Sequence, residues 1–133
     1  MMFPDPLALI IDGLLEQLGE MWVGTELPDP IETDLPAVWV NPLPGSGLNT
    51  PWNESAPLTD APSFDVDVFA KADDGPKELF GFAARVRQAL FRIPDSDRRV
   101  KRVIEDVPLT KRPDWNPKVL RVGGEYALII SRL

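Results

Sequence analysis

Asp65 and Asp67 are the carboxylates whose spacing most resembles that of a chemical site. They lie two residues apart in the segment 63–70, where apolar and polar side chains alternate. This alternation predicts a strand with both carboxylates on one face, about 7 Å apart. Such a pair could bind a hard divalent cation or act in acid–base catalysis. Because no partner acid, base or glycine-rich pocket accompanies it, we favour a strand face directed toward water or a partner.

The composition excludes the commonest catalytic and metal-binding side chains. The 133 residues contain no cysteine and no histidine. Disulfides, thiolate nucleophiles, Ser-His-Asp catalysis and zinc sites built from cysteine or histidine are therefore ruled out. The segment Gly45-Ser46-Gly47 lacks the lysine and the helix that follow a phosphate-binding loop. The composition therefore excludes much common enzymology.

Charge is distributed unevenly along the chain, whose net charge is −7. Residues 1–70 hold 12 Asp and Glu and no Lys or Arg, whereas residues 71–133 hold 14 Lys and Arg and 9 Asp and Glu. The densest basic cluster lies in residues 98–102. It has no interleaved aromatic residues and belongs to an acidic chain, so contact with an acidic protein surface is favoured over nucleic-acid binding. A solvated basic face remains an alternative.

Two helices and several strands are expected to position these residues. Apolar residues at helical spacing predict one helix from Asp5-Pro6 to residues 19–21, and a second from residues 73–76 to 94–97. Apolar and β-branched runs predict strands at 35–40, 63–70, 98–107, 119–122 and 126–130. The Pro-rich segments 41–62 and 108–117 are predicted to be loops.

The glycines Gly123-Gly124 leave two arrangements open at the C-terminal end, a hairpin turn or a bulge in one long strand. The order of the elements favours an α+β fold, with two helices packed on one face of a mostly antiparallel sheet. We expect a single domain that spans residues 1–133 and carries a long Pro-rich loop at 41–62. No signal peptide or transmembrane helix is expected, because Asp12 and Glu16 interrupt the first apolar stretch.

The second helix carries two apolar stripes, and two tryptophans lie in Pro-rich loops. The wider stripe, predicted to enter the core, comprises Leu79, Phe82, Ala83, Val86, Leu90 and Ile93. Phe80, Ala84 and Phe91 form a narrower stripe about 120° away. Either the first helix or a neighbouring subunit covers this second stripe. Trp52 and Trp115 are either anchors for a partner or plugs that hold their own loops in place.

Four segments follow one another in a characteristic order. They are Asp34-Leu35-Pro36-Ala37-Val38-Trp39-Val40, the acidic alternating strand 64–70, the helix around 83–90 and a C-terminal strand from Arg121 to Arg132. Together they resemble the tail terminator, or tail completion, proteins of long-tailed bacteriophages, especially those that infect actinobacteria. The resemblance extends over most of the chain, from about Pro4 to Leu133, with the long loop 41–62 as its main departure.

The resemblance implies a structural subunit that forms a homo-hexameric ring on the head-proximal end of the tail tube. On this resemblance we expect no enzymatic activity, no cofactor and no metal. Such a ring stops tube polymerisation and provides the docking surface for the head and neck. Its partners would be copies of itself, the major tail tube protein and a head completion or neck protein, with DNA only passing through the ring lumen and no membrane contact. The expected location is the virion tail, after assembly in the host cytoplasm.

A ring of identical subunits needs an interface in which one patch meets a different patch. We predict that acidic residues of the N-terminal half face basic residues of an adjoining subunit, while buried apolar groups supply the affinity. The predicted interface residues are Asp60, Asp65, Asp67, Phe80, Ala84, Phe91, Arg98, Arg99, Lys101, Arg102 and Trp52.

Three alternatives to a terminator remain open from the sequence. The first is another ring-forming neck component, a head completion or stopper protein. The second, from a different class, is a small acidic binding or inhibitor-like domain that recognises a basic protein. The third is an enzyme, which would need Asp65 and Asp67 to bind a metal. Both a monomer and a preformed ring are compatible with the sequence in solution.

Overall fold

The structure, a computed structural model, describes residues 4–44 and 59–131. In these residues the chain forms two α-helices, two short 3₁₀ segments and a six-stranded sheet, which confirms the α+β class. The elements, in order, are α1 (Pro6–Gln17), β1 (Trp22–Gly24), η1 (Ile31–Thr33), β2 (Ala37–Pro42), β3 (Thr59–Asp60), β4 (Ser63–Lys71), η2 (Ala72–Asp74), α2 (Pro76–Ser96), β5 (Val100–Arg112) and β6 (Val119–Ser131).

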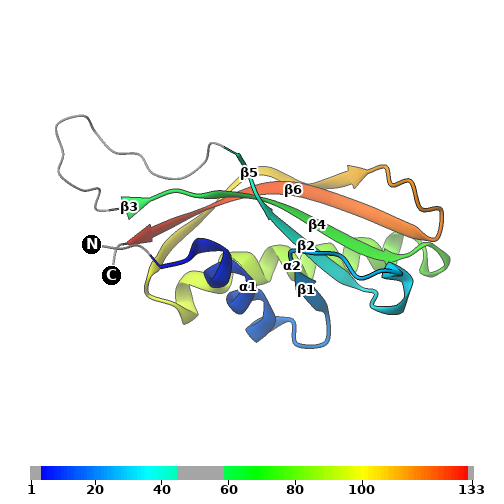
Figure 1. The fold of residues 1–133 in the computed structure, drawn as a ribbon, viewed down its shortest axis with the longest axis horizontal. Coiled ribbons are helices and arrows are strands. Elements are labelled where there is room, and N and C mark those ends of the chain that lie inside the picture. Colours follow the sequence, from blue (N-terminus) through cyan, green and yellow to red (C-terminus); the bar gives the residue numbers. More distant parts are fainter. Residues whose placement is uncertain (1–3, 45–58, 132–133) are drawn as a thin grey trace.

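The sheet is mostly antiparallel, with β4 and β6 at its centre (Figure 1). β4 pairs with β2 on one side and β6 on the other, and only the short β1–β2 pair is parallel. β3 continues the register of β4 past Pro62, since Asp60 pairs with Ile130 just as Ser63 pairs with Ala127. β5 pairs with the free side of β6 and forms a long hairpin with it.

One large core cluster combines both helices with alternate residues of the strands. Its fully buried members include Ile10, Leu14, Val38, Val40, Phe64, Val66, Val68, Val86, Leu90, Ile93, Val122, Tyr126, Leu128 and Ile130. The stripe predicted for the core of α2 is confirmed, with Phe82 only partly buried. The strand residues between these core positions face the opposite side of the sheet, which we call the outer face.

The helix starts are built differently from each other. Asp5 caps α1 as predicted, because its side chain accepts a hydrogen bond from the Leu7 backbone N–H at 3.1 Å. The prediction that Asp73-Asp74 starts the second helix is wrong in detail. Those residues form η2, and α2 begins after Gly75, whose φ of 85° favours glycine and which provides no side-chain cap.

β5 is longer and less regular than the sequence predicts. It runs to Arg112, so the first part of the predicted loop 108–117 belongs to the strand. Among the described residues β5 pairs only with β6, so Pro108 lies in an edge strand, where its missing N–H is tolerated. Three register shifts interrupt the β5–β6 ladder, and Val103 joins Val100 in the core.

Gly123 and Gly124 lie inside β6, so the hairpin alternative is wrong and the long strand is correct. The extra residues of the bulges lie in β5, and two of the three bulges, between Glu105 and Thr110, lie next to these glycines. A Cβ atom on Gly124 would collide with the backbone of β5 at Val107 and Pro108. The glycine therefore permits the two strands to approach closely where β5 is bulged.

Part of the outer face is covered by the segment between β1 and β2. Ala37, Phe69 and Val119 form a second buried cluster there, and Leu27, Ile31, Leu35, Trp22 and Trp39 pack against it. This packing fixes residues 25–36 beside the start of β6. Within the described residues, neither helix combines the length and apolar character needed to cross a membrane.

Candidate functional site

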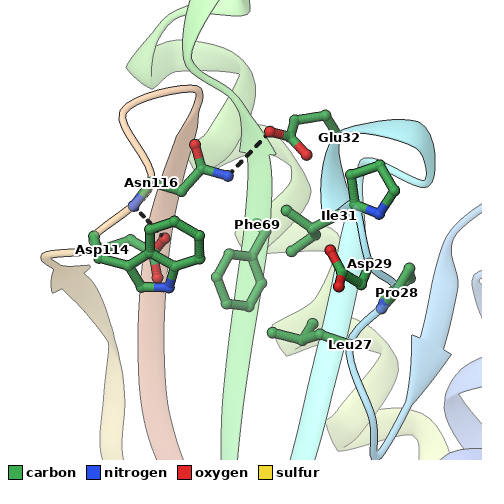
Figure 2. A pocket seen from close by; sticks show the side chains of 10 residues that line it. Leu27, Pro28, Asp29, Ile31, Glu32, Phe69, Asp114 and Asn116 are labelled. Carbon is green, nitrogen blue, oxygen red and sulfur yellow. Dashed lines mark hydrogen bonds between the residues drawn. The ribbon is translucent and has the colours of Figure 1, made fainter.

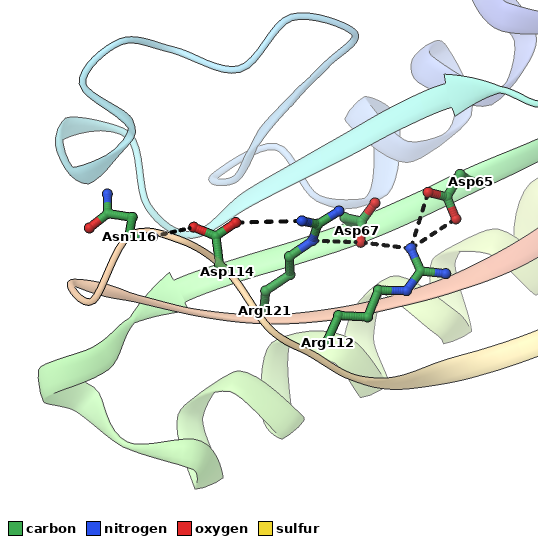
Figure 3. Close-up of polar contacts among 6 residues, drawn as sticks. All are labelled: Asp65, Asp67, Arg112, Asp114, Asn116 and Arg121. Atoms are coloured by element: carbon green, nitrogen blue, oxygen red, sulfur yellow. Dashed lines mark hydrogen bonds and ion pairs between the residues drawn. The ribbon is translucent and has the colours of Figure 1, made fainter.

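Asp65 and Asp67 are bound by two arginines of the β5–β6 hairpin (Figure 3). Arg112 Nη1 donates to Asp65 Oδ1 at 2.9 Å and to Asp67 Oδ1 at 3.0 Å. Arg121 Nε donates to the same Asp67 oxygen at 3.0 Å, and its Nη1 donates to Asp114 Oδ1 at 3.4 Å. The predicted alternation of β4 is confirmed, but the predicted exposure of Asp67 is wrong, because its side chain is fully buried among these groups.

The surrounding backbone leaves room for this arginine–aspartate network. Gly123 lies opposite Asp67 in the β4–β6 ladder, and a Cβ atom there would collide with Asp67 Oδ1 and the nearby guanidinium group. Arg121 Cζ lies 5.8 Å from the ring centroid of Trp39 and 5.3 Å from that of Phe69. The ring contacts and the ion pairs together fix the Arg121 side chain.

Two opposing effects act on the charge of the Asp67 carboxylate. Burial disfavours the charged form, and the two neighbouring arginines favour it. Burial raises the pKa of Asp67 above its ordinary range, and the hydrogen bond from Arg121 opposes this shift. Its Oδ2 atom is buried and has no hydrogen-bond partner in the described residues. Because both carboxylates already bind guanidinium groups, the network is an internal structural brace. In residues 4–44 and 59–131, no group of three or more acidic side chains could hold a metal ion.

The cationic half of this network was not predicted from the sequence. Arg112 falls in the segment predicted as a loop, and its partners lie 45 and 47 residues away. Arg121 lies two residues before Gly123, on the strand that pairs with the acidic strand. An arginine two residues before a glycine, on a strand next to the acidic alternating strand, is the signal in the sequence that could have indicated a buried arginine–aspartate pair.

A cavity of about 390 Å³ lies on the outer face, between residues 27–32 and the tip of the β5–β6 hairpin. Figure 2 shows Phe69 between Leu27 and Ile31 on one side and Asp114 and Asn116 on the other. Trp115, at the hairpin tip, also lines the cavity and is 90% exposed. The cavity thus has an apolar floor and one freely accessible aromatic wall.

The rim of this cavity is acidic, and the described residues that line it include no lysine or arginine. Its charged lining residues are Asp29, Glu32 and Asp114. Asn116 Nδ2 donates to Glu32 Oε1 at 3.2 Å, and a backbone hydrogen bond together with this one lowers the pKa of Glu32. Asp114 is occupied by Arg121 and by the Asn116 backbone N–H. Asp29 and Glu32 therefore supply the accessible negative charge, with Lys118 the only cation that acts on Glu32 among the described residues.

The narrower stripe of α2 is exposed. Phe80 is 52% and Phe91 is 39% exposed, and Ala84 is also exposed. The alternative in which the first helix covers this stripe is wrong, because α1 contacts another side of α2, as the hydrogen bond from Gln17 to the Ala89 carbonyl shows. The subunit-interface alternative for the stripe stays a prediction.

A second polar cluster joins α2 to the hairpin beside Phe91. Arg87 Nε and the Tyr126 hydroxyl each donate to Glu105 Oε2 at 2.7 Å. Phe91 packs edge-on against Tyr126 at 6.4 Å, and Arg87 Cζ lies 5.1 Å from the Phe91 ring centroid. The hydrogen bond from Arg87 lowers the pKa of Glu105, whereas burial raises the pKa of Tyr126. These contacts hold Phe91 in a fixed orientation at the surface.

The predicted basic residues lie in and after the turn between α2 and β5. Arg98, Lys101 and Arg102 are exposed, and none has an ion-pair partner among the described residues. Arg99 is different, because it binds Asp97 through two hydrogen bonds of 3.0 and 2.8 Å. We call residues 98–102 the basic turn.

The two remaining predicted interface residues are not available as exposed groups in the described structure. Asp60 is largely buried in β3, where its Oδ1 accepts from the Ala61 N–H at 2.8 Å. Trp52 lies outside the described residues. The structure therefore brings together Asp65 and Asp67, but not with the basic turn of the same chain.

Comparison with known protein families and with curated proteins found no match to this chain.

Proposed function

We propose that this chain is a structural subunit of a long phage tail, a tail terminator that forms a ring on the head-proximal end of the tail tube. In this proposal α1 and α2 pack together on one face of the sheet, which is supported by the single core cluster that the two helices share with β2, β4 and β6. The α+β class and the confirmed strand 63–71 are consistent with the resemblance on which the proposal rests.

One observation carries the proposal: the subunit has two unlike charged surfaces at opposite ends. The cavity with Asp29 and Glu32 is lined by residues that lie close to the start of β6, and the basic turn lies beside the end of β6, where Val100 pairs with Ile130. The two ends of β6 lie at opposite ends of the sheet (Figure 1). A contact between unlike patches repeats from subunit to subunit and closes into a ring when the rotation allows it.

The accessible aromatic groups provide a source of affinity for such contacts. Trp115, Phe80 and Phe91 are large apolar side chains at the surface, of the kind that contribute most of the binding energy at interfaces. Charges at the rim mainly set orientation and association rate. This combination suits a subunit that assembles in a defined direction on the end of a tube.

The proposal is tested by adding the purified chain to tail tubes that are growing from the major tail protein of the same phage. We expect electron microscopy to show a ring at one end of each tube and growth to stop at that end. The Trp115→Ala variant, which removes the exposed aromatic side chain, is compared with wild type, and we expect it to cap fewer tubes. Tubes that continue to grow at both ends in excess wild-type protein would contradict the proposal.

A further inference from the structure

The chemistry of the cavity between residues 27–32 and Trp115 selects a cation on an apolar stem. Asp29 and Glu32 present carboxylates at its rim, and Phe69 lies at its floor. Trp115 offers an accessible indole, the ring that binds cations most strongly. Arginine and lysine combine an apolar stem with a charged head, and arginine also stacks on aromatic rings. The cavity is therefore complementary to one of these side chains.

The basic turn of the same chain carries cations of this kind. Arg98, Lys101 and Arg102 are exposed and make no ion pair with the described residues. They cannot reach the cavity of their own chain, because β6 separates the two places by the length from Val119 to Ile130, about 35 Å. A cation from the basic turn can therefore enter the cavity only from another molecule.

We propose that the acidic cavity of one copy receives the basic turn of a second copy. This proposal rests on the ring-forming function proposed above and specifies its interface. It replaces the acidic side of the predicted interface: Asp29 and Glu32 take the role expected of Asp65 and Asp67, whose carboxylates bind arginines of their own chain. The contact is directional, since each copy uses its cavity toward one neighbour and its turn toward the other.

Two variants with one disabled surface each test the proposal. The cavity variant carries Asp29→Asn and Glu32→Gln, and the turn variant carries Arg98→Gln and Arg102→Gln. The matched control neutralises two exposed acids that neither line the cavity nor belong to the basic turn, with Glu16→Gln and Asp106→Asn. In sedimentation velocity at about 1 mM, a micromolar contact is saturated, and we expect wild type and control to associate beyond dimers. We expect each variant alone to associate at least about tenfold more weakly.

An equimolar mixture of the two variants gives the sharpest outcome. The intact turn of the cavity variant fits the intact cavity of the turn variant, so we expect dimers that contain one of each and do not grow further. Equal association of wild type and both variants, or mixtures that form large assemblies, would overturn the proposal. A wild type that stays monomeric at this concentration would likewise overturn the proposal.

The absence of cysteine permits a clean cross-linking test. A chain with Thr33→Cys, beside the cavity, and Ser96→Cys, beside the basic turn, should oxidise to a ladder of linked oligomers. The control pair is Thr33→Cys with Asp106→Cys, whose second position is exposed and lies outside both surfaces. No ladder, or a ladder of equal yield from the control pair, would overturn the contact between copies. Neither result would exclude tube capping, which the tube-growth experiment measures separately.

Discussion

Replacement of Asp67 by alanine tests the arginine–aspartate network through a large loss of stability. Asp67 is fully buried and accepts from both Arg112 and Arg121 at 3.0 Å. Removing it leaves two partly buried guanidinium groups without their shared acceptor. Breaking a buried pair in this way costs about 3 to 5 kcal/mol. Because the arginines remain 27% and 21% exposed, we expect the lower end, about 3 kcal/mol.

Asp65→Ala is the matched control for this prediction. Its side chain is 25% exposed and binds only Arg112, so its loss is expected to cost about 1 kcal/mol or less. Urea unfolding followed by circular dichroism gives the free energy of unfolding of both variants. In thermal unfolding, Asp67→Ala should lower the midpoint temperature by about 10 °C. In a double-mutant cycle, Arg121→Ala should couple to Asp67→Ala by about 1 kcal/mol or more. Equal costs for the two aspartates would refute the assignment of Asp67 as the centre of the network.

Four further variants test other parts of the structure. Because Arg87 lowers the pKa of Glu105, the stabilisation from Glu105 is complete above its ordinary pKa of 4.5 and is lost as the pH falls through the lowered value. Glu105→Gln should therefore lose less stability than wild type on acidification. Urea unfolding at several pH values tests this, and an equal dependence of the unfolding free energy on pH in the two proteins would contradict it. Gly123→Ala should cost about 2 kcal/mol because its Cβ collides with the network, whereas Gly81→Ala, in open space on α2, should stabilise by about 0.5 to 1 kcal/mol; chemical denaturation compares the two. Asp5→Ala should cost about 1 kcal/mol through loss of the α1 cap, and an unchanged unfolding midpoint would show that the cap contributes nothing.

The helices and the central strand could be predicted from local patterns. The apolar spacing of α2 and the alternation of residues 63–70 each reflect a periodicity that the fold preserves. The edge strand β5 could not be predicted correctly, because each bulge shifts the faces of all following residues by one. Pro108, which indicates a loop in isolation, is compatible with the free edge of a sheet.

The candidate site depended on contacts that local patterns do not contain. Asp67 looks solvated in sequence because its arginine partners lie 45 and 54 residues further along the chain. The cavity likewise joins Asp29 and Glu32, in a Pro-rich connection, to Trp115 at a distant hairpin tip. The basic turn could be predicted from the sequence alone, because its charges are consecutive in the chain and do not depend on contacts made by the fold.

The length distribution of tails assembled without this chain tests the central claim most directly. The proposal predicts that a phage that encodes this chain, once the gene is deleted, makes tails of variable and extended length that carry no heads, which electron microscopy would show. Restoring the wild-type chain should restore uniform tails joined to heads. Tails of normal, uniform length that join heads in the absence of the chain would contradict the assignment as a tail terminator.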